Sequence, residues 1–236
     1  MKRSVYTRQV IEEFPFQEIR MGILSWWERK EQRHFPWRET CDPFKVLVAE
    51  ILLHRTRADQ VVPLYELFLK KYPDINSIAQ SSPEELATSF SSAGLHWRWA
   101  LLYSMAIEIN TRFSGEIPQG FDDLVSLPGV SHYIASALRC FSFGYPDVLL
   151  DTNTVRIAGR IFGFPITDSS RRSGLLKRLI GELMTTEKCR EFNFAQLDFA
   201  AKICRPKPIH NQCPIKEYCK FYNLNEFKHE GILQNG

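Results

Sequence analysis

Helix start and stop signals recur along the whole chain, whereas the alternating pattern that is typical of strands is nearly absent. Ser82-Pro83-Glu84-Glu85 combines a capping box with a proline at the first helical position, and Gly94 stands where that helix would end. HYIASALRCFSFG places apolar residues on one helical face and then stops at Gly144. DVLLD is the only strand-like run, and it is short. The sequence therefore predicts an all-α fold built from many short helices.

Length and composition limit the class of protein further. The chain has 236 residues, of which 44% are hydrophobic, which is enough for one large domain or two small lobes with a core. No apolar run approaches the roughly 20 residues that a transmembrane helix needs, and no signal-peptide stretch follows the first basic residues. We therefore expect a soluble, intracellular protein with no membrane partner. The net charge of +3 permits nucleic-acid binding without requiring it.

A Pro-Gly turn joins two of the predicted helices in the segment DDLVSLPGVSHYIASAL. Pro128 ends the first helix, and Gly129 allows a tight reversal of the chain. The second helix then begins with backbone N–H groups that have no intrahelical acceptor, and its dipole favours an anion at the same end. The hairpin at 122–143 is thus either a binding site for a DNA phosphate or an ordinary turn between helices.

LPGVSHYIASAL followed by LLDTNTVRI resembles the helix-hairpin-helix DNA glycosylases, the superfamily of endonuclease III and the mismatch adenine glycosylases. FPWRETCDPFKVLVAEILLHRT, SAGLHWRWA and FNFAQLDFAAKIC are similar to other segments of that family, in the family's order, so the resemblance covers about residues 34–220. It implies two helical lobes with a cleft for double-stranded DNA that contains a mismatched or damaged base, in a monomeric protein. The six-helix barrel lobe would span 39–145, and 1–38 with 146–236 would form the second lobe.

The resemblance implies two residues at the reacting sugar. The family places an aspartate shortly after the hairpin, and Asp151 stands at that position. A carboxylate there stabilises the positive charge that develops on the sugar as the glycosidic bond breaks, although Asp151 is also a good N-cap residue. Tyr133 replaces the lysine with which endonuclease III-like enzymes attack the sugar. A phenol forms no imine, so we expect no lyase step. A tyrosine at this position resembles the branch of the family that releases thymine from G·T mismatches.

Glu50 is a second acidic candidate. It is a lone carboxylate within the apolar run VLVAEILL, where burial would favour its protonated form and suit it to protonate a leaving base. The alternative is that Glu50 lies on the polar stripe of its helix. In the adenine glycosylases a glutamate at the matching position acts on the leaving base, so Glu50 does not separate adenine from thymine release.

Further residues are implied to contact DNA. Leu95 matches the family's wedge residue, which fills the space of an extruded base. His54 and Arg55 match the loop that contacts the orphaned base, where an arginine can donate to guanine. The alternative for each of these three is that it is only a solvated loop residue. Trp97 and Trp99 are expected in the core. The hairpin contributes Gly129, Val130, Ser131 and His132, and Ser131 stands where the family usually has a second glycine.

CRPKPIHNQCPIKEYC crowds three cysteines and a histidine into 16 residues. The family's iron–sulfur loop has the spacing C-x6-C-x2-C-x5-C, and the last pair matches Cys213 and Cys219. His210 takes the second position, one residue closer to Cys204 than in the family. Three cysteines and one histidine suit a 4Fe–4S cluster or zinc, and the third alternative is a loop without metal. In this family the cluster is structural.

Together these features predict a monofunctional glycosylase that removes thymine or uracil from G·T or G·U mismatches. One alternative is adenine release opposite 8-oxoguanine or guanine. An alternative from another class is a non-catalytic DNA-binding module that keeps the hairpin. A repair enzyme of this kind would lie with the genome, in the cytoplasm and nucleoid or in a eukaryotic nucleus.

Overall fold

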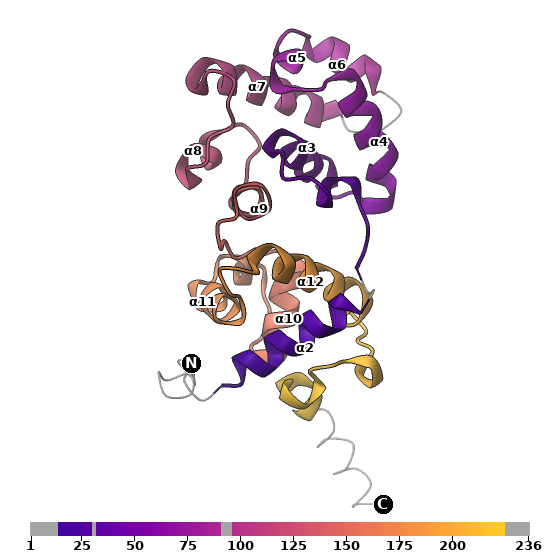
Figure 1. The fold of residues 1–236 in the computed structure, drawn as a ribbon, viewed down its shortest axis with the longest axis vertical. Helices are drawn as coiled ribbons and strands as arrows, with labels where there is room; N and C mark the ends of the chain where they lie inside the picture. Colours follow the sequence, from indigo (N-terminus) through magenta and orange to yellow (C-terminus); the bar gives the residue numbers. More distant parts are fainter. Residues whose placement is uncertain (1–13, 30–31, 91–95, 225–236) are drawn as a thin grey trace, which may run out of the picture. The chain divides into compact units, whose positions relative to one another are not determined.

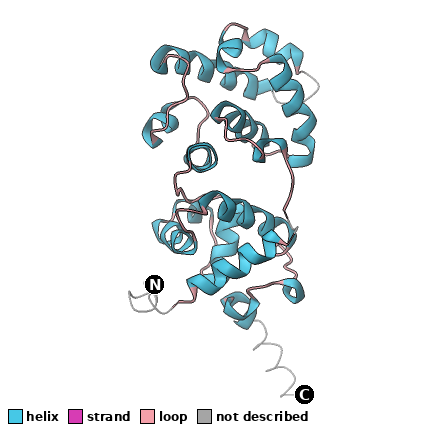
Figure 2. Ribbon diagram, in the orientation of Figure 1, coloured by secondary structure: helices cyan, strands magenta, loops and turns pink. Residues whose placement is uncertain are grey.

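The computed structural model describes residues 14–29, 32–90 and 96–224, and these form two compact units. Unit 1 contains the described parts of 1–33 and 148–236, and unit 2 contains those of 34–147. The predicted boundaries of the barrel lobe, at residues 39 and 145, lie a few residues from these limits. All regular structure in the described ranges is helical, as predicted (Figures 1 and 2). None of the described helices is both long and apolar enough to cross a membrane.

Unit 2 is a helical lobe that ends in the predicted hairpin. Its elements are η1 (Pro36–Arg38), α3 (Pro43–Leu53), α4 (Ala58–Lys71), α5 (Ile75–Ala79), α6 (Pro83–Ser89), α7 (His96–Phe113), α8 (Phe121–Ser126) and α9 (His132–Phe143). Its described residues thus carry one α-helix more than the six predicted, because Asp74 and Ser82 each cap a separate short helix. α6 ends at Ser89, and the predicted stop at Gly94 lies outside the described residues.

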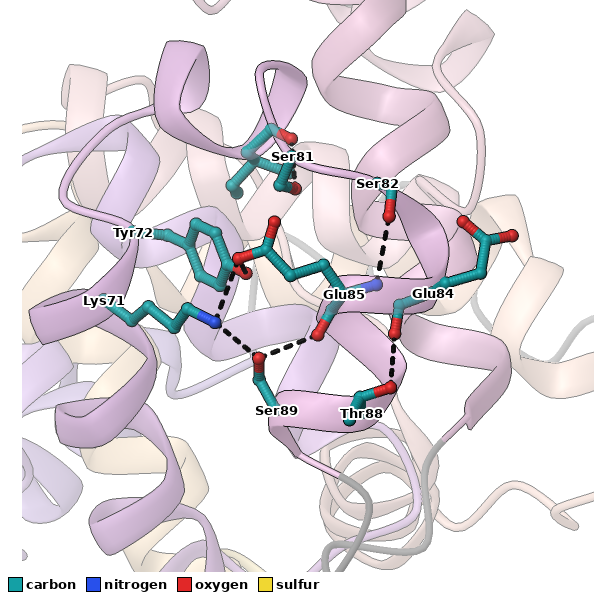
Figure 3. Close-up of polar contacts among 9 residues, drawn as sticks. Lys71, Tyr72, Ser81, Ser82, Glu84, Glu85, Thr88 and Ser89 are labelled. Atoms are coloured by element: carbon teal, nitrogen blue, oxygen red, sulfur yellow. Dashed lines mark hydrogen bonds and ion pairs between the residues drawn. The ribbon is translucent and has the colours of Figure 1, made fainter.

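Aromatic packing and an exposed polar network hold the outer helices of unit 2. The Phe90 ring lies 5.3 Å from the Phe68 ring and 4.8 Å from that of Trp99, which is fully buried as predicted. Figure 3 shows the polar network at the surface: Lys71 at the end of α4 forms a 3.0 Å ion pair with Glu85 of α6. Because both partners are exposed, the apolar core supplies most of the stability here.

Unit 1 joins the two ends of the chain. Its elements are α2 (Phe16–Glu28), α10 (Thr152–Phe162), η3 (Asp168–Arg172), α11 (Gly174–Leu183), α12 (Cys189–Lys202), η4 (His210–Gln212) and η5 (Lys216–Tyr218). The N-terminal helix α2 packs against α11 and α12, and α10 packs against the same two helices (Figure 1). Fully buried Ile19, Ile23, Phe192 and Phe199 form part of this core. The packing fixes the start of α10, where Asp151 lies.

Candidate active site and DNA-contact residues

Asp151 is the N-cap of α10, and hydrogen bonds fix both of its carboxylate oxygens. Oδ1 accepts from the backbone N–H groups of Asn153 (2.9 Å) and Thr154 (2.7 Å), and Oδ2 accepts from Asn153 Nδ2 (2.8 Å). The Thr154 hydroxyl accepts in turn from the Asp151 N–H, which completes a capping box. These N–H donors and the positive end of the helix dipole hold the carboxylate in place at the start of α10. The half-buried group is therefore arranged to stabilise a neighbouring positive charge.

Two residues near Asp151 were not predicted from the sequence. Asn153 fixes the second carboxylate oxygen, and the Asp-x-Asn spacing at a helix start was a signal that could have identified it. The Arg156 guanidinium donates to the carbonyls of Cys204 (2.9 Å) and Ala200 (3.2 Å). Burial lowers the pKa of Arg156, and the charge of Asp151 acts in the opposite direction. Arg156 thus adds a cation near the carboxylate and ties α10 to the end of α12.

The predicted hairpin is present between α8 and α9. Gly129 has a φ of 77°, in the left-handed region that favours glycine, and a side chain there would meet Leu101. Ser131 caps α9, because its hydroxyl accepts from the Ile134 N–H at 3.2 Å. Val130 is buried beneath the turn, while Ser131 and His132 are exposed. The serine that replaces the family's second glycine therefore shapes the start of α9 and leaves the turn accessible to a phosphate.

Tyr133 and Glu50 lie on neighbouring helices of unit 2. Tyr133 is in the first turn of α9 and is half-buried, and Glu50 lies in α3, which packs against α9. The Glu50 side chain is only 9% exposed, so it does not belong to an exposed polar stripe. This burial meets the condition under which Glu50 was predicted to act on a leaving base.

His54 and Arg55 form an exposed turn after α3. Arg55 has a φ of 61°, which is rare for a residue with a side chain, and His54 lies edge-on to Trp97 at 5.5 Å. Burial lowers the pKa of His54, with contributions from the charges of Arg55 and Arg98, which favours the neutral imidazole. Trp97 is 49% exposed and was wrongly expected in the core, because it covers this turn rather than the helix interior. Leu95, the predicted wedge, lies outside the described residues.

The loop at 204–219 is organised around Arg160 of α10. This guanidinium donates to the carbonyls of Cys204 (3.4 Å), Arg205 (2.6 Å) and Pro206 (2.8 Å), and to the Cys204 sulfur at 3.3 Å. It also lies 5.0 Å from the centre of the Phe221 ring. One arginine thus satisfies three consecutive carbonyls at the start of the loop.

The four predicted metal ligands all lie in the described part of this loop. The His210 ring lies edge-on to Tyr222 at 5.0 Å and to Phe221 at 6.1 Å. Burial raises the pKa of the Cys213 thiol to about 11 and also raises that of Cys219, and Cys204 contributes electrostatically to both shifts. Among the residues that the structure describes, no three or more His, Cys, Asp or Glu side chains are grouped to hold a metal ion. The metal and its ligand set therefore stay a prediction.

Replacing Arg160 with methionine is expected to loosen this loop. The change removes charged hydrogen bonds to the three carbonyls and should lower the free energy of local opening by about 2 kcal/mol. Cys213 and Cys219 should then react up to about 30-fold faster with an alkylating reagent in the folded protein, as followed by mass spectrometry. Arg205→Met, which changes an exposed side chain in the same loop, is the matched control. Equal labelling of both variants would show that Arg160 does not hold the loop.

The chain is similar over most of its length to curated DNA glycosylases. It is 35% identical over 215 residues to the thymine-DNA glycosylase of Aeropyrum pernix, covering 88% of this chain and 95% of the relative. It is 37% identical over 219 residues to the thymine/uracil-DNA glycosylase of Pyrobaculum aerophilum, covering 89% and 94%. A comparison with models of protein families finds no match.

Solved structures agree with the sequence relatives. The fold matches a thermostable thymine-DNA glycosylase with a TM-score of 0.81 at 33% identity, covering 88% of this chain and 96% of the other. An endonuclease III trapped covalently on DNA matches with a TM-score of 0.73 over 90% of this chain and 99% of the other, and at 21% identity it shows the shared fold alone. The chain therefore belongs to the thymine/uracil-DNA glycosylases, within the helix-hairpin-helix DNA glycosylase superfamily.

Proposed function

We propose that this protein removes thymine or uracil opposite guanine in double-stranded DNA and leaves the sugar–phosphate backbone intact. The observation that carries the chemistry is the capped Asp151 carboxylate, whose two oxygens are fixed by three hydrogen bonds. The choice of base is supported by the names of the relatives, a thymine-DNA glycosylase and a thymine/uracil-DNA glycosylase.

The proposed reaction is hydrolysis of the N-glycosidic bond after the target nucleotide has left the base stack. As the bond to the base lengthens, positive charge develops on the sugar, and the Asp151 carboxylate stabilises it. Since Asn153 and the α10 N-terminus hold that carboxylate in one orientation, little reorganisation is needed in the transition state. Glu50 is the proposed proton donor to the leaving base. A water molecule then adds to the sugar carbon that carried the base and loses a proton.

Phosphate and base contacts are assigned to exposed residues of unit 2. The hairpin residues around Gly129 and Ser131 present backbone N–H groups at the start of α9, which suits a phosphate oxygen. His54 and Arg55 are the proposed contacts to the orphaned guanine. We further propose that the protein acts as a monomer and lies with the genome, in the cytoplasm and nucleoid or in a nucleus.

Single-turnover incubation with an end-labelled duplex that contains one G·T mismatch tests this function. Samples are split and analysed with and without hot alkali. A break that appears only after alkali is the expected result, because it reports base removal without strand cleavage. A duplex that stays intact in both samples would contradict thymine release, and the same assay with adenine opposite 8-oxoguanine would then test the adenine alternative.

Changing Tyr133 to lysine is expected to add a lyase activity that the natural chain lacks. The position matches the lysine of endonuclease III-like enzymes, and a primary amine can form an imine with the sugar aldehyde whereas a phenol cannot. Borohydride should therefore trap the Tyr133→Lys variant on abasic DNA but leave the unmodified protein untrapped. Tyr145→Lys, at an exposed tyrosine after α9, is the control. Trapping of the unmodified protein would contradict the monofunctional assignment.

A 4Fe–4S cluster held by Cys204, His210, Cys213 and Cys219 remains a prediction from the loop spacing, with zinc and no metal as its alternatives. We derive no catalytic step from it. Iron, sulfide and zinc analysis of protein purified without oxygen distinguishes the three, since each predicts a different metal content per chain.

A further inference from the structure

Arg98 is a buried cation whose acceptors all belong to one turn of the chain. It lies in the first turn of α7 and is 1% exposed. Its guanidinium donates to the carbonyl of Leu52 at 2.8 Å, to the carbonyl of His54, and to the Thr56 hydroxyl at 3.0 Å. No carboxylate is among its acceptors in the described part of the chain, and Nε has no hydrogen-bond partner there.

These contacts complete the end of α3. The last carbonyls of a helix have no intrahelical donor, and here the turn supplies only some of them. The His54 N–H donates to Ile51 at 3.4 Å, and the Thr56 N–H donates to Leu53 at 3.1 Å. Arg98 supplies donors for two further carbonyls, those of Leu52 and His54. The guanidinium therefore supports the end of α3, where His54 is the C-cap residue.

Such an arrangement is costly for a purely structural turn. A buried guanidinium without a carboxylate partner loses hydration that three neutral acceptors only partly replace, and apolar packing would be cheaper. Arg55 adds a left-handed backbone conformation, which glycine would adopt without strain. Strain and buried charge thus converge on the turn whose exposed side chains, His54 and Arg55, are the proposed contacts to the orphaned base.

We propose that Arg98 is a positioning residue that sets the preference for guanine opposite the released base, by holding the turn so that Arg55 faces the orphaned base. This inference rests on the proposed function. Arg98 itself does not touch DNA. It fixes the backbone on either side of His54. The preference for guanine then arises because Arg55 is held where its guanidinium matches the acceptors of guanine and not the amino group of adenine.

The test uses the full-length protein and duplexes that carry a tetrahydrofuran abasic analogue opposite guanine or opposite adenine. Arg55→Ala is expected to reduce the ratio of the two affinities by about tenfold, in line with the loss of one bidentate contact. Arg98→Met should reduce the ratio about as much, and the double variant should reduce it no further, because both changes remove the same contact. Arg112→Met, an exposed arginine on the same helix, should leave the ratio unchanged.

Protein stability is followed separately by thermal melting. A merely structural Arg98 would lower the melting temperature and leave the guanine-to-adenine ratio intact, which would overturn the proposal, as would independent, multiplying effects in the double variant. An unchanged ratio in Arg55→Ala would overturn it too. If Arg98→Met does not fold, Thr56→Val removes one acceptor while leaving the guanidinium in place, and should reduce the ratio to a smaller extent. Absence of base release from a G·T duplex by the unmodified protein would instead point to failure of the proposed function.

Discussion

Changing Asp151 to asparagine is expected to lower the single-turnover rate on a G·T duplex by roughly 100- to 1,000-fold without lowering the melting temperature. Asparagine and aspartate are about equally good N-cap residues, so the start of α10 should stay folded around Thr154. What the change removes is the negative charge that faces the developing cation. Base release measured in single turnover, beside affinity for the same duplex and thermal melting, separates the loss of charge from a loss of structure.

Two controls give this experiment its meaning. Asp168→Asn changes an exposed aspartate at the start of η3 and should leave the rate unchanged. Asp151→Ala removes both the charge and the cap, so it should lose activity and about 1 kcal/mol of stability as well. An Asp151→Asn variant with full activity would show that the residue is a helix cap only. A non-catalytic DNA-binding module would have no base release for either substitution to remove.

The sequence predicted the features that depend on residues close together in the chain. The Pro-Gly turn, the serine cap of α9 and the Asp151 cap of α10 were all predictable, because a capping side chain and the N–H groups that donate to it lie within three positions of one another. Glu50 was predicted from a lone carboxylate in an apolar run, and it is buried. For the turn and the two caps, the partners that decide the conformation are neighbours in the sequence.

Residues whose partners are distant in the sequence were missed. Arg98 bonds to a turn more than 40 residues away, and Arg160 bonds to carbonyls at 204–206. From the sequence alone, an arginine in a helix is predicted to be solvated. Only the fold shows that carbonyls without a backbone donor lie beside it. Asp198 carried the same signal as Glu50, a carboxylate within the apolar stretch FAQLDFAAKIC, and deserved the same prediction of burial. Spacing alone likewise could not show that His210 packs between aromatic rings.

Removing the Asp198 carboxylate is expected to cost unit 1 more stability than any other single change considered. The side chain is 0% exposed in α12, where it accepts from Trp27 Nε1 of α2 at 2.8 Å and from Arg33, through the backbone N–H at 3.0 Å and Nε at 2.5 Å. Asp198→Ala removes the carboxylate that accepts from all three of these donors, one of which belongs to a cation. Breaking a buried pair in this way costs about 3–5 kcal/mol, or roughly 10 °C in melting temperature for a chain of this size.

The graded variants of this site should follow the number of donors that stay satisfied. Asp198→Asn keeps an acceptor oxygen but loses the charge, so it should cost less than Asp198→Ala. Arg33 loses its ion pair with Asp198 in both variants, whereas Trp27 keeps an acceptor in Asp198→Asn. Glu28→Gln, in an exposed 3.4 Å pair with Lys188 of the same unit, is the matched control and should change the stability by less than about 1 kcal/mol. Urea unfolding measures all three. If Asp198→Ala unfolds no more easily than Glu28→Gln, then α2 and α12 are held by apolar packing alone, and the buried carboxylate has a purpose other than stability.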